Sequence, residues 1–342
     1  MKSFFLAASL LLAAEGFAPI AHKPAFTTSL SASNVNEINP MKPGSTCALV
    51  TPFTTKGKID VPALRKLLRF HVENGTDGLC ILGTTGEASV MTMDERATVL
   101  TTAVEEVKGK IPILAGTGTI DPEHVKEMTL QAIDIGCDAS LVVTPYYVKP
   151  PQRGLVKHFL TMADLGLPVV IYNIPGRAMV DFKPESIALV ADHENIIGVK
   201  EATGDLTRVD ELRELTGDKL LLLSGDDSSD AEFVMRGGDG CISVVANLAP
   251  KAKHDLMMAA LRGDKAEMER IGDQLKPLNK KLFIESNPIP AKWAAMRMGL
   301  IPTAYCRPPL DELDKKFYSD VDEAMHAAGL VGEIYTGDAV ML

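Results

Sequence analysis

The chain has no cluster of basic residues, and acidic residues are in excess: 45 Asp and Glu against 35 Lys and Arg, a net charge of −10. Such a chain is not expected to bind nucleic acid or an anionic membrane surface. It also has no C-x-x-C spacing, and its cysteines are odd in number and lie mostly in apolar segments: Cys47, Cys80, Cys137, Cys241 and Cys306. This pattern favours reduced core cysteines in a protein that works in a reducing compartment.

The N-terminus lacks an apolar run long enough to span a bilayer. Lys2 precedes an apolar run at 4–14, which has the outline of a signal peptide. Residues 17–36 contain no Asp or Glu and several Ser and Thr, as organelle transit segments do. Together they resemble the two-part presequence of plastid proteins in algae with complex plastids. We therefore expect 1–40 to be removed and the mature protein to have no membrane segment. Ordinary secretion is the alternative, and the unpaired cysteines count against it.

From residue 45 onward, strand-like and helix-like patterns alternate regularly. Eight short apolar segments are strand candidates: 46–51, 78–82, 111–115, 139–144, 168–173, 196–200, 219–224 and 240–245. Helical spacing appears between them, for example at 61–74 and 94–108. The pattern predicts an α/β fold, a (β/α)8 TIM barrel over 41–248, rather than a doubly wound sheet.

After the eighth strand candidate the pattern is purely helical. Helices are expected over four segments, joined by Gly- and Pro-rich turns: 249–262, 265–278, 288–298 and 310–328. We interpret 249–342 as a C-terminal helical extension packed on the barrel. Its methionines are expected to be core or subunit contacts.

The sixth strand candidate ends in a lysine. The segment 196–199 is apolar or small, and it is followed by Lys200 and a Thr-Gly turn. Such a run indicates a parallel strand buried on both faces, whose carboxyl end lies where barrel enzymes bind ligands. An amine held there against apolar neighbours loses hydration, which favours the neutral, nucleophilic form used in Schiff bases. The alternative is a lysine that extends into solvent at a strand end.

Other strand candidates also end in polar residues. Strand two is followed by Thr84 and Thr85, strand four by Tyr146 and Tyr147, and strand seven by Gly225 and an Asp pair. Strand five carries Tyr172 near its end, and Arg177 follows it. In a barrel these groups converge on one rim. An acid–base hydroxyl, carboxylate donors and an amine are the groups that a Schiff-base enzyme needs.

No histidine is predicted at that rim. The histidines beyond the presequence fall in helical patterns or, for His193, in a connection: His71, His124, His158, His193, His254 and His326. A zinc or iron site is therefore not indicated. The pair Asp226-Asp227 is interpreted as a helix cap rather than a magnesium site, and 116–118 (GTG) as a turn rather than a dinucleotide fingerprint. We expect no nucleotide or metal cofactor.

Five ordered motifs carry a resemblance to a known family: 83–87 (GTTGE), 144–147 (TPYY), 172–177 (YNIPGR), 197–204 (IGVKEATG) and 223–227 (LSGDD). From about residue 45 onward the chain resembles the dihydrodipicolinate synthase (4-hydroxy-tetrahydrodipicolinate synthase) family of pyruvate-dependent aldolases. The resemblance implies condensation of pyruvate with aspartate semialdehyde, the first committed step of lysine biosynthesis through diaminopimelate.

The resemblance also implies residue roles. Lys200 would form an imine with pyruvate, and Tyr172 would move protons, relayed by Thr84 and by Tyr147 from a neighbouring subunit. Thr85 would hold the pyruvate carboxylate and Arg177 the carboxylate of the semialdehyde. Gly225 and the backbone carbonyl of Ile242 would shape the pocket wall. Ala178 departs from the family, which usually has Thr there.

Two other functions remain open at this point. N-acetylneuraminate lyases and keto-sugar-acid aldolases share the lysine and tyrosine, although they usually lack the arginine found here as Arg177. A catalytically inactive barrel that serves as a binding protein is the second alternative. By family analogy we expect a homotetramer.

The resemblance finally implies a regulatory cleft that binds free lysine in many members. Acceptor groups are expected there, but this chain has Ile120 and His124 where the family usually has Asn and Glu, and Met93 and Arg96 at positions of bacterial histidines. Tyr146 is kept. We therefore predict an enzyme that lysine hardly inhibits, the alternative being binding through other groups such as Glu123.

Overall fold

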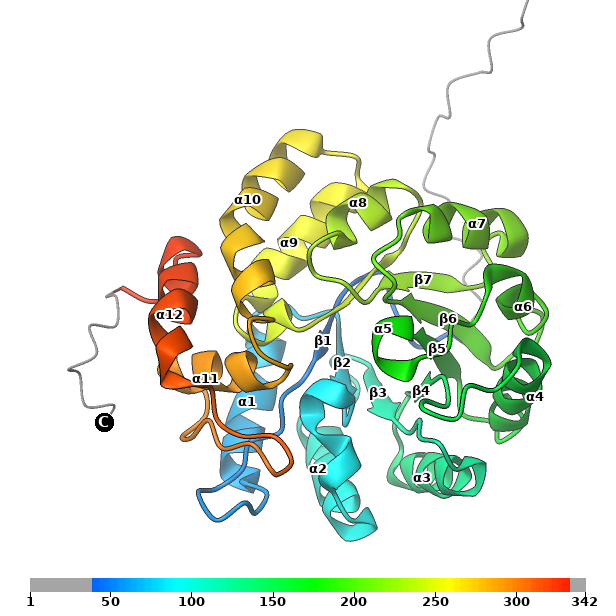
Figure 1. Ribbon diagram of the computed structural model, residues 1–342, viewed down its shortest axis with the longest axis horizontal. Coiled ribbons are helices and arrows are strands. Elements are labelled where there is room, and N and C mark those ends of the chain that lie inside the picture. Colours follow the sequence, from blue (N-terminus) through cyan, green and yellow to red (C-terminus); the bar gives the residue numbers. More distant parts are fainter. Residues whose placement is uncertain (1–38, 333–342) are drawn as a thin grey trace, which may run out of the picture. The chain divides into compact units, whose positions relative to one another are not determined.

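A computed structural model describes residues 39–332, so the predicted presequence lies almost wholly outside the described residues. Eight parallel strands form a closed barrel in sequence order, β1 to β8 (Figure 1). The strands are β1 (Gly44–Ala48), β2 (Gly78–Ile81), β3 (Ile113–Gly116), β4 (Ala139–Val143), β5 (Val169–Asn173), β6 (Ile196–Glu201), β7 (Leu221–Ser224) and β8 (Gly240–Ser243). The predicted TIM barrel is confirmed.

Helices follow the strands around the barrel and continue beyond it. Those between strands are α1 (Val61–Glu73), α2 (Met93–Val107), α3 (Pro122–Ile135), α4 (Gln152–Ala163), α5 (Pro175–Ala178), α6 (Pro184–Ala188), α7 (Thr207–Thr216) and α8 (Asp230–Met235). Beyond β8 come α9 (Pro250–Leu261), α10 (Lys265–Lys281), α11 (Ile289–Arg297) and α12 (Tyr318–Ala327). α10 packs against α9 and α12, as Figure 1 shows, which confirms the helical extension.

Local sequence explains where the early helices begin. The Asp60 carboxylate accepts from the backbone N of Ala63 and starts α1. Thr92 and Glu95 form a reciprocal capping box at the start of α2. Such caps satisfy backbone N–H groups that have no partner inside the helix. The two helices begin at Val61 and Met93, within one residue of the starts that the sequence pattern predicted.

The core has an inner and an outer part. Inside the barrel, side chains from several strands form one buried cluster that includes Leu114, Val170, Tyr172 and Ile242. Two larger clusters lie between the strands and the helices. Alternate residues of a strand point to opposite faces, and here both faces are covered, which explains the nearly continuous apolar runs in the sequence.

Several predicted boundaries are wrong, and two of them have a clear structural cause. The first strand was expected at 46–51 but pairs from Gly44 to Ala48, because Gly44 to Cys47 lie in register with β8 and the chain then leaves the ladder. The last helix was expected from 310, but a 3-10 turn at Lys315–Phe317 precedes α12, which begins at Tyr318. Asp314 caps the start of this turn, since its carboxylate accepts from the backbone N of Lys316.

All five cysteines are buried and free, as expected for reduced core residues: Cys47, Cys80, Cys137, Cys241 and Cys306. Burial raises the pKa of Cys80 to about 11 and that of Cys137 to about 12. These thiols are therefore protonated and unreactive at neutral pH. Within residues 39–332, no helix has the length and apolar character needed to cross a membrane.

Candidate active site

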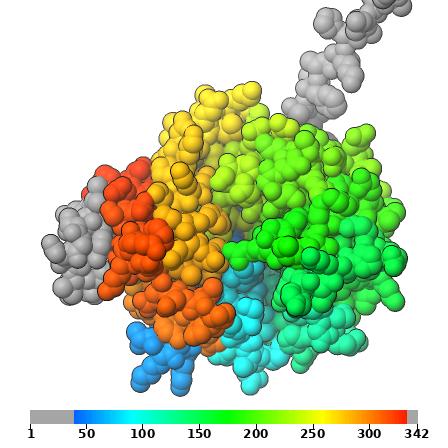
Figure 2. Space-filling view, in the orientation of Figure 1, coloured from blue at the N-terminus to red at the C-terminus, as the bar shows by residue number. Residues whose placement is uncertain are grey.

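A recess opens at the carboxyl ends of the strands, with about 470 Å³ of empty space, part of it open to solvent. Its polar lining residues are Thr84, Thr85, Tyr172, Arg177, Lys200 and Asn287. Its apolar lining includes Ala48, Leu141, Ile174, Val244 and Phe283. Figure 2 shows a hollow on this face, where the yellow-to-orange extension borders green and cyan barrel segments. The structure therefore brings most of the predicted rim residues together.

Lys200 and Tyr172 form the centre of this recess. They are direct neighbours in the β5–β6 ladder, and the Lys200 Nζ lies 4.2 Å from the centroid of the Tyr172 ring. Both side chains are buried, with 6% and 7% of their surface exposed. Lys200 does not extend into solvent, which rules out the alternative for its strand end. An amine that faces an aromatic ring and an open recess is placed to react with a bound carbonyl compound.

Gly225 gives the Lys200 side chain its space. A Cβ at position 225 would lie 3.0 Å from the Lys200 Cε and 2.6 Å from the Ala202 Cβ. Either contact would force the lysine chain or the backbone to move. The predicted role of Gly225 in shaping the pocket wall thus has a direct steric basis.

Thr84 and Thr85 lie in a short 3-10 turn after β2. Thr84 is exposed on the recess, whereas Thr85 is buried and its Oγ1 accepts a hydrogen bond from the Asn287 Nδ2 at 2.8 Å. The turn is held by Glu87, whose carboxylate pairs with the Lys292 Nζ at 2.6 Å, both side chains being almost fully buried. The extension therefore helps to fix the hydroxyl pair of the barrel rim.

Arg177 lies in α5, directly after β5, and is exposed on the recess. Its Nη2 is 3.5 Å from the backbone oxygen of Asn287, which is a weak contact. No carboxylate is paired with it among residues 39–332, so its guanidinium is available to an anionic ligand. A planar guanidinium can hold a carboxylate through two parallel hydrogen bonds.

The sequence profile of the Dihydrodipicolinate synthetase family matches residues 41–328. The chain belongs to this family. It is 45% identical over 289 residues to the 4-hydroxy-tetrahydrodipicolinate synthase of Pseudomonas aeruginosa. The matched region covers 84% of this chain and 99% of the relative. The predictions of this family and of a lyase of its kind are confirmed, and the relatives favour the synthase over the N-acetylneuraminate lyase alternative.

Solved structures of the family agree. The dihydrodipicolinate synthase of Acinetobacter baumannii, complexed with pyruvate, superimposes with a TM-score of 0.83 at 40% identity and covers 84% of this chain and 99% of that one. The family enzyme of Cyanidioschyzon merolae, with lysine bound, gives a TM-score of 0.82 at 34% identity and covers 84% and 99%. The similarity includes the barrel and the helical extension alike.

Two predicted site residues lie outside the recess of their own chain. Ile242 is buried in the cluster inside the barrel, and Val244, at the turn after β8, lines the recess instead. Tyr147 is 81% exposed, with a left-handed backbone at φ 70°. A residue that reaches into a neighbouring subunit has to be exposed on its own chain, as Tyr147 is. The role of Tyr147 stays a prediction.

The strand residues next to Lys200 and Tyr172 form a buried polar contact. Asn173 and Glu201 follow Tyr172 and Lys200 and face the opposite side of the sheet. The Asn173 Nδ2 donates to the Glu201 Oε2 at 3.0 Å, and the backbone N of Thr203 donates to the Oε1 at 2.8 Å. Burial raises the pKa of Glu201, although these hydrogen bonds oppose the shift. The contact fixes the register in which Tyr172 and Lys200 face each other. β6 itself ends at Glu201, one residue later than the sequence pattern predicted.

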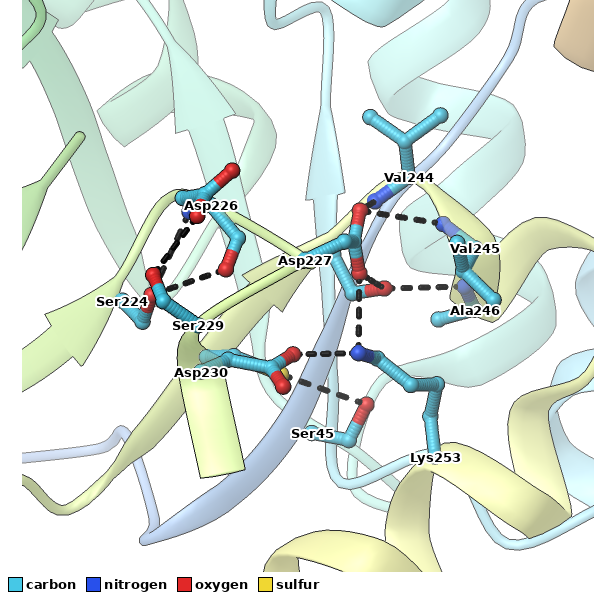
Figure 3. Close-up of polar contacts among 12 residues, drawn as sticks. Ser45, Ser224, Asp226, Asp227, Ser229, Asp230, Val244, Val245, Ala246 and Lys253 are labelled. Atoms are coloured by element: carbon cyan, nitrogen blue, oxygen red, sulfur yellow. Dashed lines mark hydrogen bonds and ion pairs between the residues drawn. The ribbon is translucent and has the colours of Figure 1, made fainter. Parts of the chain in front are cut away.

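The interpretation of Asp226-Asp227 as a helix cap is wrong for both residues, because Ser229 is the N-cap of α8 and no side chain caps that helix. The Asp227 carboxylate is buried and accepts from the backbone N of Val244 at 2.8 Å (Figure 3). It also accepts from the Ser243 hydroxyl. The Lys253 Nζ lies 3.0 Å from the Asp227 Oδ1 and also contacts Asp230. Burial opposes ionisation of Asp227, but Lys253 and Ser243 outweigh it and leave its pKa lowered. This ion cluster links the turns after β7 and β8, both of which line the recess.

Within the part of the chain that the structure describes, no group of three or more His, Cys, Asp or Glu side chains is arranged to hold a metal ion. Sequence reasoning missed Asn287 and Phe283, which line the recess from the extension. Residue 287 was assigned only to a Pro-rich turn between helices. Its partner Thr85 is 202 positions away, and no local pattern indicates such a contact.

Proposed function

We propose that this chain condenses pyruvate with L-aspartate 4-semialdehyde to 4-hydroxy-tetrahydrodipicolinate. The observation that carries the proposal is the buried Lys200 amine beside Tyr172 in an open recess, flanked by Thr85 and Arg177. Membership of the family supports the pair of substrates. Purified protein incubated with both substrates should form the cyclic product, and absence of the product would contradict the proposal.

The side chains have distinct roles in this reaction. The Lys200 Nζ attacks the keto carbon of pyruvate, and loss of water gives an imine. Removal of a methyl proton gives an enamine, whose carbon adds to the aldehyde of the second substrate. The amino group of the semialdehyde then attacks the imine carbon and displaces the Lys200 Nζ, which closes the ring and frees the lysine. Tyr172 moves these protons with Thr84, and Thr85 holds the pyruvate carboxylate. The enzyme needs no cofactor, because the imine itself accepts the electron pair.

Replacing Arg177 with alanine should impair the second substrate selectively. Loss of a charge-assisted contact with the semialdehyde carboxylate costs roughly 1.5–3 kcal/mol, which corresponds to roughly a 10- to 150-fold loss in kcat/KM for the semialdehyde. Pyruvate trapping on Lys200 by borohydride should persist. Arg177→Lys is the matched control, because it keeps the charge and loses the planar fork. Equal damage to trapping and to semialdehyde use would show that the assignment is wrong.

The proposed assembly is a homo-oligomer, a tetramer by analogy with the family, in which Tyr147 completes a partner's site. Tyr147 and the neighbouring Met179 are 81% and 61% exposed, and the backbone N of Tyr147 donates to the Ala178 oxygen. These side chains form an apolar surface suited to a partner subunit. One relative is described as the first monomeric dihydrodipicolinate synthase variant, so assembly has to be measured. An active monomer in sedimentation would contradict the proposal.

The proposed location is a plastid, reached through the presequence at 1–40, with secretion as the alternative. The supporting feature is the apolar run at 4–14 followed by an acid-free, Ser- and Thr-rich tract. A chain that starts at Asn39 should keep full activity. Loss of activity on this truncation would mean that the presequence assignment is wrong.

Free lysine should inhibit this enzyme weakly. Ile120 is 37% exposed and offers no acceptor, and the His124 Nδ1 is 3.0 Å from the Glu127 Oε2. Arg96 was expected at the rim of the cleft, but it is 2% exposed and its Nη2 donates to the backbone oxygen of Gly116 at 2.6 Å. Two ammonium groups of lysine therefore lose acceptors, a loss of roughly three orders of magnitude in affinity.

Activity at rising lysine concentration, with both substrates fixed, measures this effect. The double variant Ile120→Asn, His124→Glu restores acceptors and is expected to gain inhibition. Strong inhibition of the unmodified enzyme at sub-millimolar lysine would contradict the prediction.

A further inference from the structure

Asn287 brings a polar side chain from the C-terminal extension into the recess. It precedes α11 and is 7% exposed, and its Nδ2 lies 2.8 Å from the Thr85 Oγ1. Thr85 is itself only 3% exposed. The contact is therefore screened from water, and its direction decides how the Thr85 hydroxyl is presented to a ligand.

A carboxamide nitrogen only donates, whereas a hydroxyl can donate and accept. Because the Thr85 oxygen accepts from Asn287, its own hydrogen remains free to be donated elsewhere. The Asn287 Nδ2 is the atom that faces Thr85, and the Asn287 Oδ1 is buried without a hydrogen-bond partner among residues 39–332. Thr85 and Asn287 both line the recess.

We propose that Asn287 is a positioning residue that orients the Thr85 hydroxyl, so that its proton is donated to the carboxylate of pyruvate. The inference rests on the proposed function, in which Thr85 holds that carboxylate. Asn287 acts through Thr85 and takes no part in the chemistry. It makes the extension a part of the pyruvate site.

A second contact holds the two residues at this spacing. The Glu87 Oε1 pairs with the Lys292 Nζ at 2.6 Å, and the Glu87 Oε2 accepts from the backbone N of Arg307 at 2.8 Å. Glu87 follows Thr85 by two positions, and Lys292 lies in the helix that Asn287 precedes. These contacts use no atom of residue 287, so we expect them to stay in place when that residue is changed. A substitution there alters the direction of the hydrogen bond more than the spacing.

The variant Asn287→Asp tests the direction. An aspartate carboxylate only accepts, so it takes the Thr85 proton away from the pyruvate carboxylate and adds a negative charge beside it. The pyruvate concentration for half-maximal borohydride trapping on Lys200 should rise roughly 10- to 150-fold. The KM for pyruvate should rise with it, and the KM for the semialdehyde should change little. A structural defect would raise both KM values.

Two controls complete the test. Ser286→Asp adds the same charge on an exposed neighbouring side chain, whereas the hydrogen bond to Thr85 comes from Asn287, so pyruvate saturation should be almost unchanged. Asn287→Ala removes the donor without reversing the bond, and its effect should be smaller than that of Asn287→Asp. Thermal melting shows whether each variant is folded.

Specific results would overturn the inference. Unchanged pyruvate saturation in Asn287→Asp would mean that Thr85 donates to residue 287, and an equal rise in both KM values would mean that the contact is only structural. A larger defect in Asn287→Ala than in Asn287→Asp would also contradict it. Failure of the unmodified enzyme to trap pyruvate would instead contradict the proposed function.

Discussion

Replacing Lys200 with alanine is expected to reduce activity by at least roughly 10³-fold and to abolish borohydride trapping of pyruvate. Lys200 is 6% exposed, and its Nζ lies 4.2 Å from the Tyr172 ring centroid in the recess. The described part of the recess contains no other lysine. No second amine is therefore placed to form the imine, and pyruvate cannot be converted to the nucleophilic enamine. Intact mass after borohydride treatment measures the adduct directly.

An exposed lysine provides the matched control. Lys219 pairs with Asp192 at the surface, and its side chain is 56% exposed. Lys219→Ala should keep both activity and one pyruvate adduct per chain. If Lys200→Ala still gave an adduct that peptide mapping placed on another residue, the imine assignment would be wrong.

The barrel and the placement of Lys200 beside Tyr172 could be predicted because the relevant signals are local. A parallel strand buried on both faces produces an apolar run, and Lys200 interrupts such a run at its end. Tyr172 lies near the end of the fifth run in the same way, and Arg177 follows that run. The carboxyl ends of all barrel strands lie on one rim, so the order of motifs along the chain was enough to predict that these residues lie close together.

The rest depends on contacts between distant parts of the chain. Asn287 is 202 positions from Thr85, and nothing near it in the sequence indicates that it enters the recess. Lys253 was assigned to an ordinary helix, but it is fully buried against Asp227 and Asp230. A charge hidden in this way is visible only when its partners are placed beside it. The same holds for the start of β1, which is set by its register with β8.

Replacing Lys253 with methionine should destabilise the fold by about 3–5 kcal/mol, because it leaves two buried carboxylates without their cation. Asp227 and Asp230 are 4% and 2% exposed, and Lys253 contacts both (Figure 3). Their negative charges hold the pKa of Lys253 above its usual value despite burial, so the ammonium is charged in the folded chain. The apparent Tm is expected to fall by roughly 5–15 °C. Lys251→Met, on the exposed side of the same helix, should change the free energy of unfolding by less than about 0.5 kcal/mol.

The deficit of Lys253→Met should also depend on pH in a defined direction. Burial already raises the pKa of Asp230 to about 6, although Lys253 opposes the shift. Without Lys253, the pKa of both carboxyls in the folded variant lies above their unfolded value of about 4. Such a group stabilises the fold below its unfolded pKa, and this stabilisation is lost as pH rises. The loss of stability should therefore be largest near neutral pH and smaller near about pH 4 to 5. A deficit that stays constant over this range would show that packing, not the unpaired carboxylates, causes the loss.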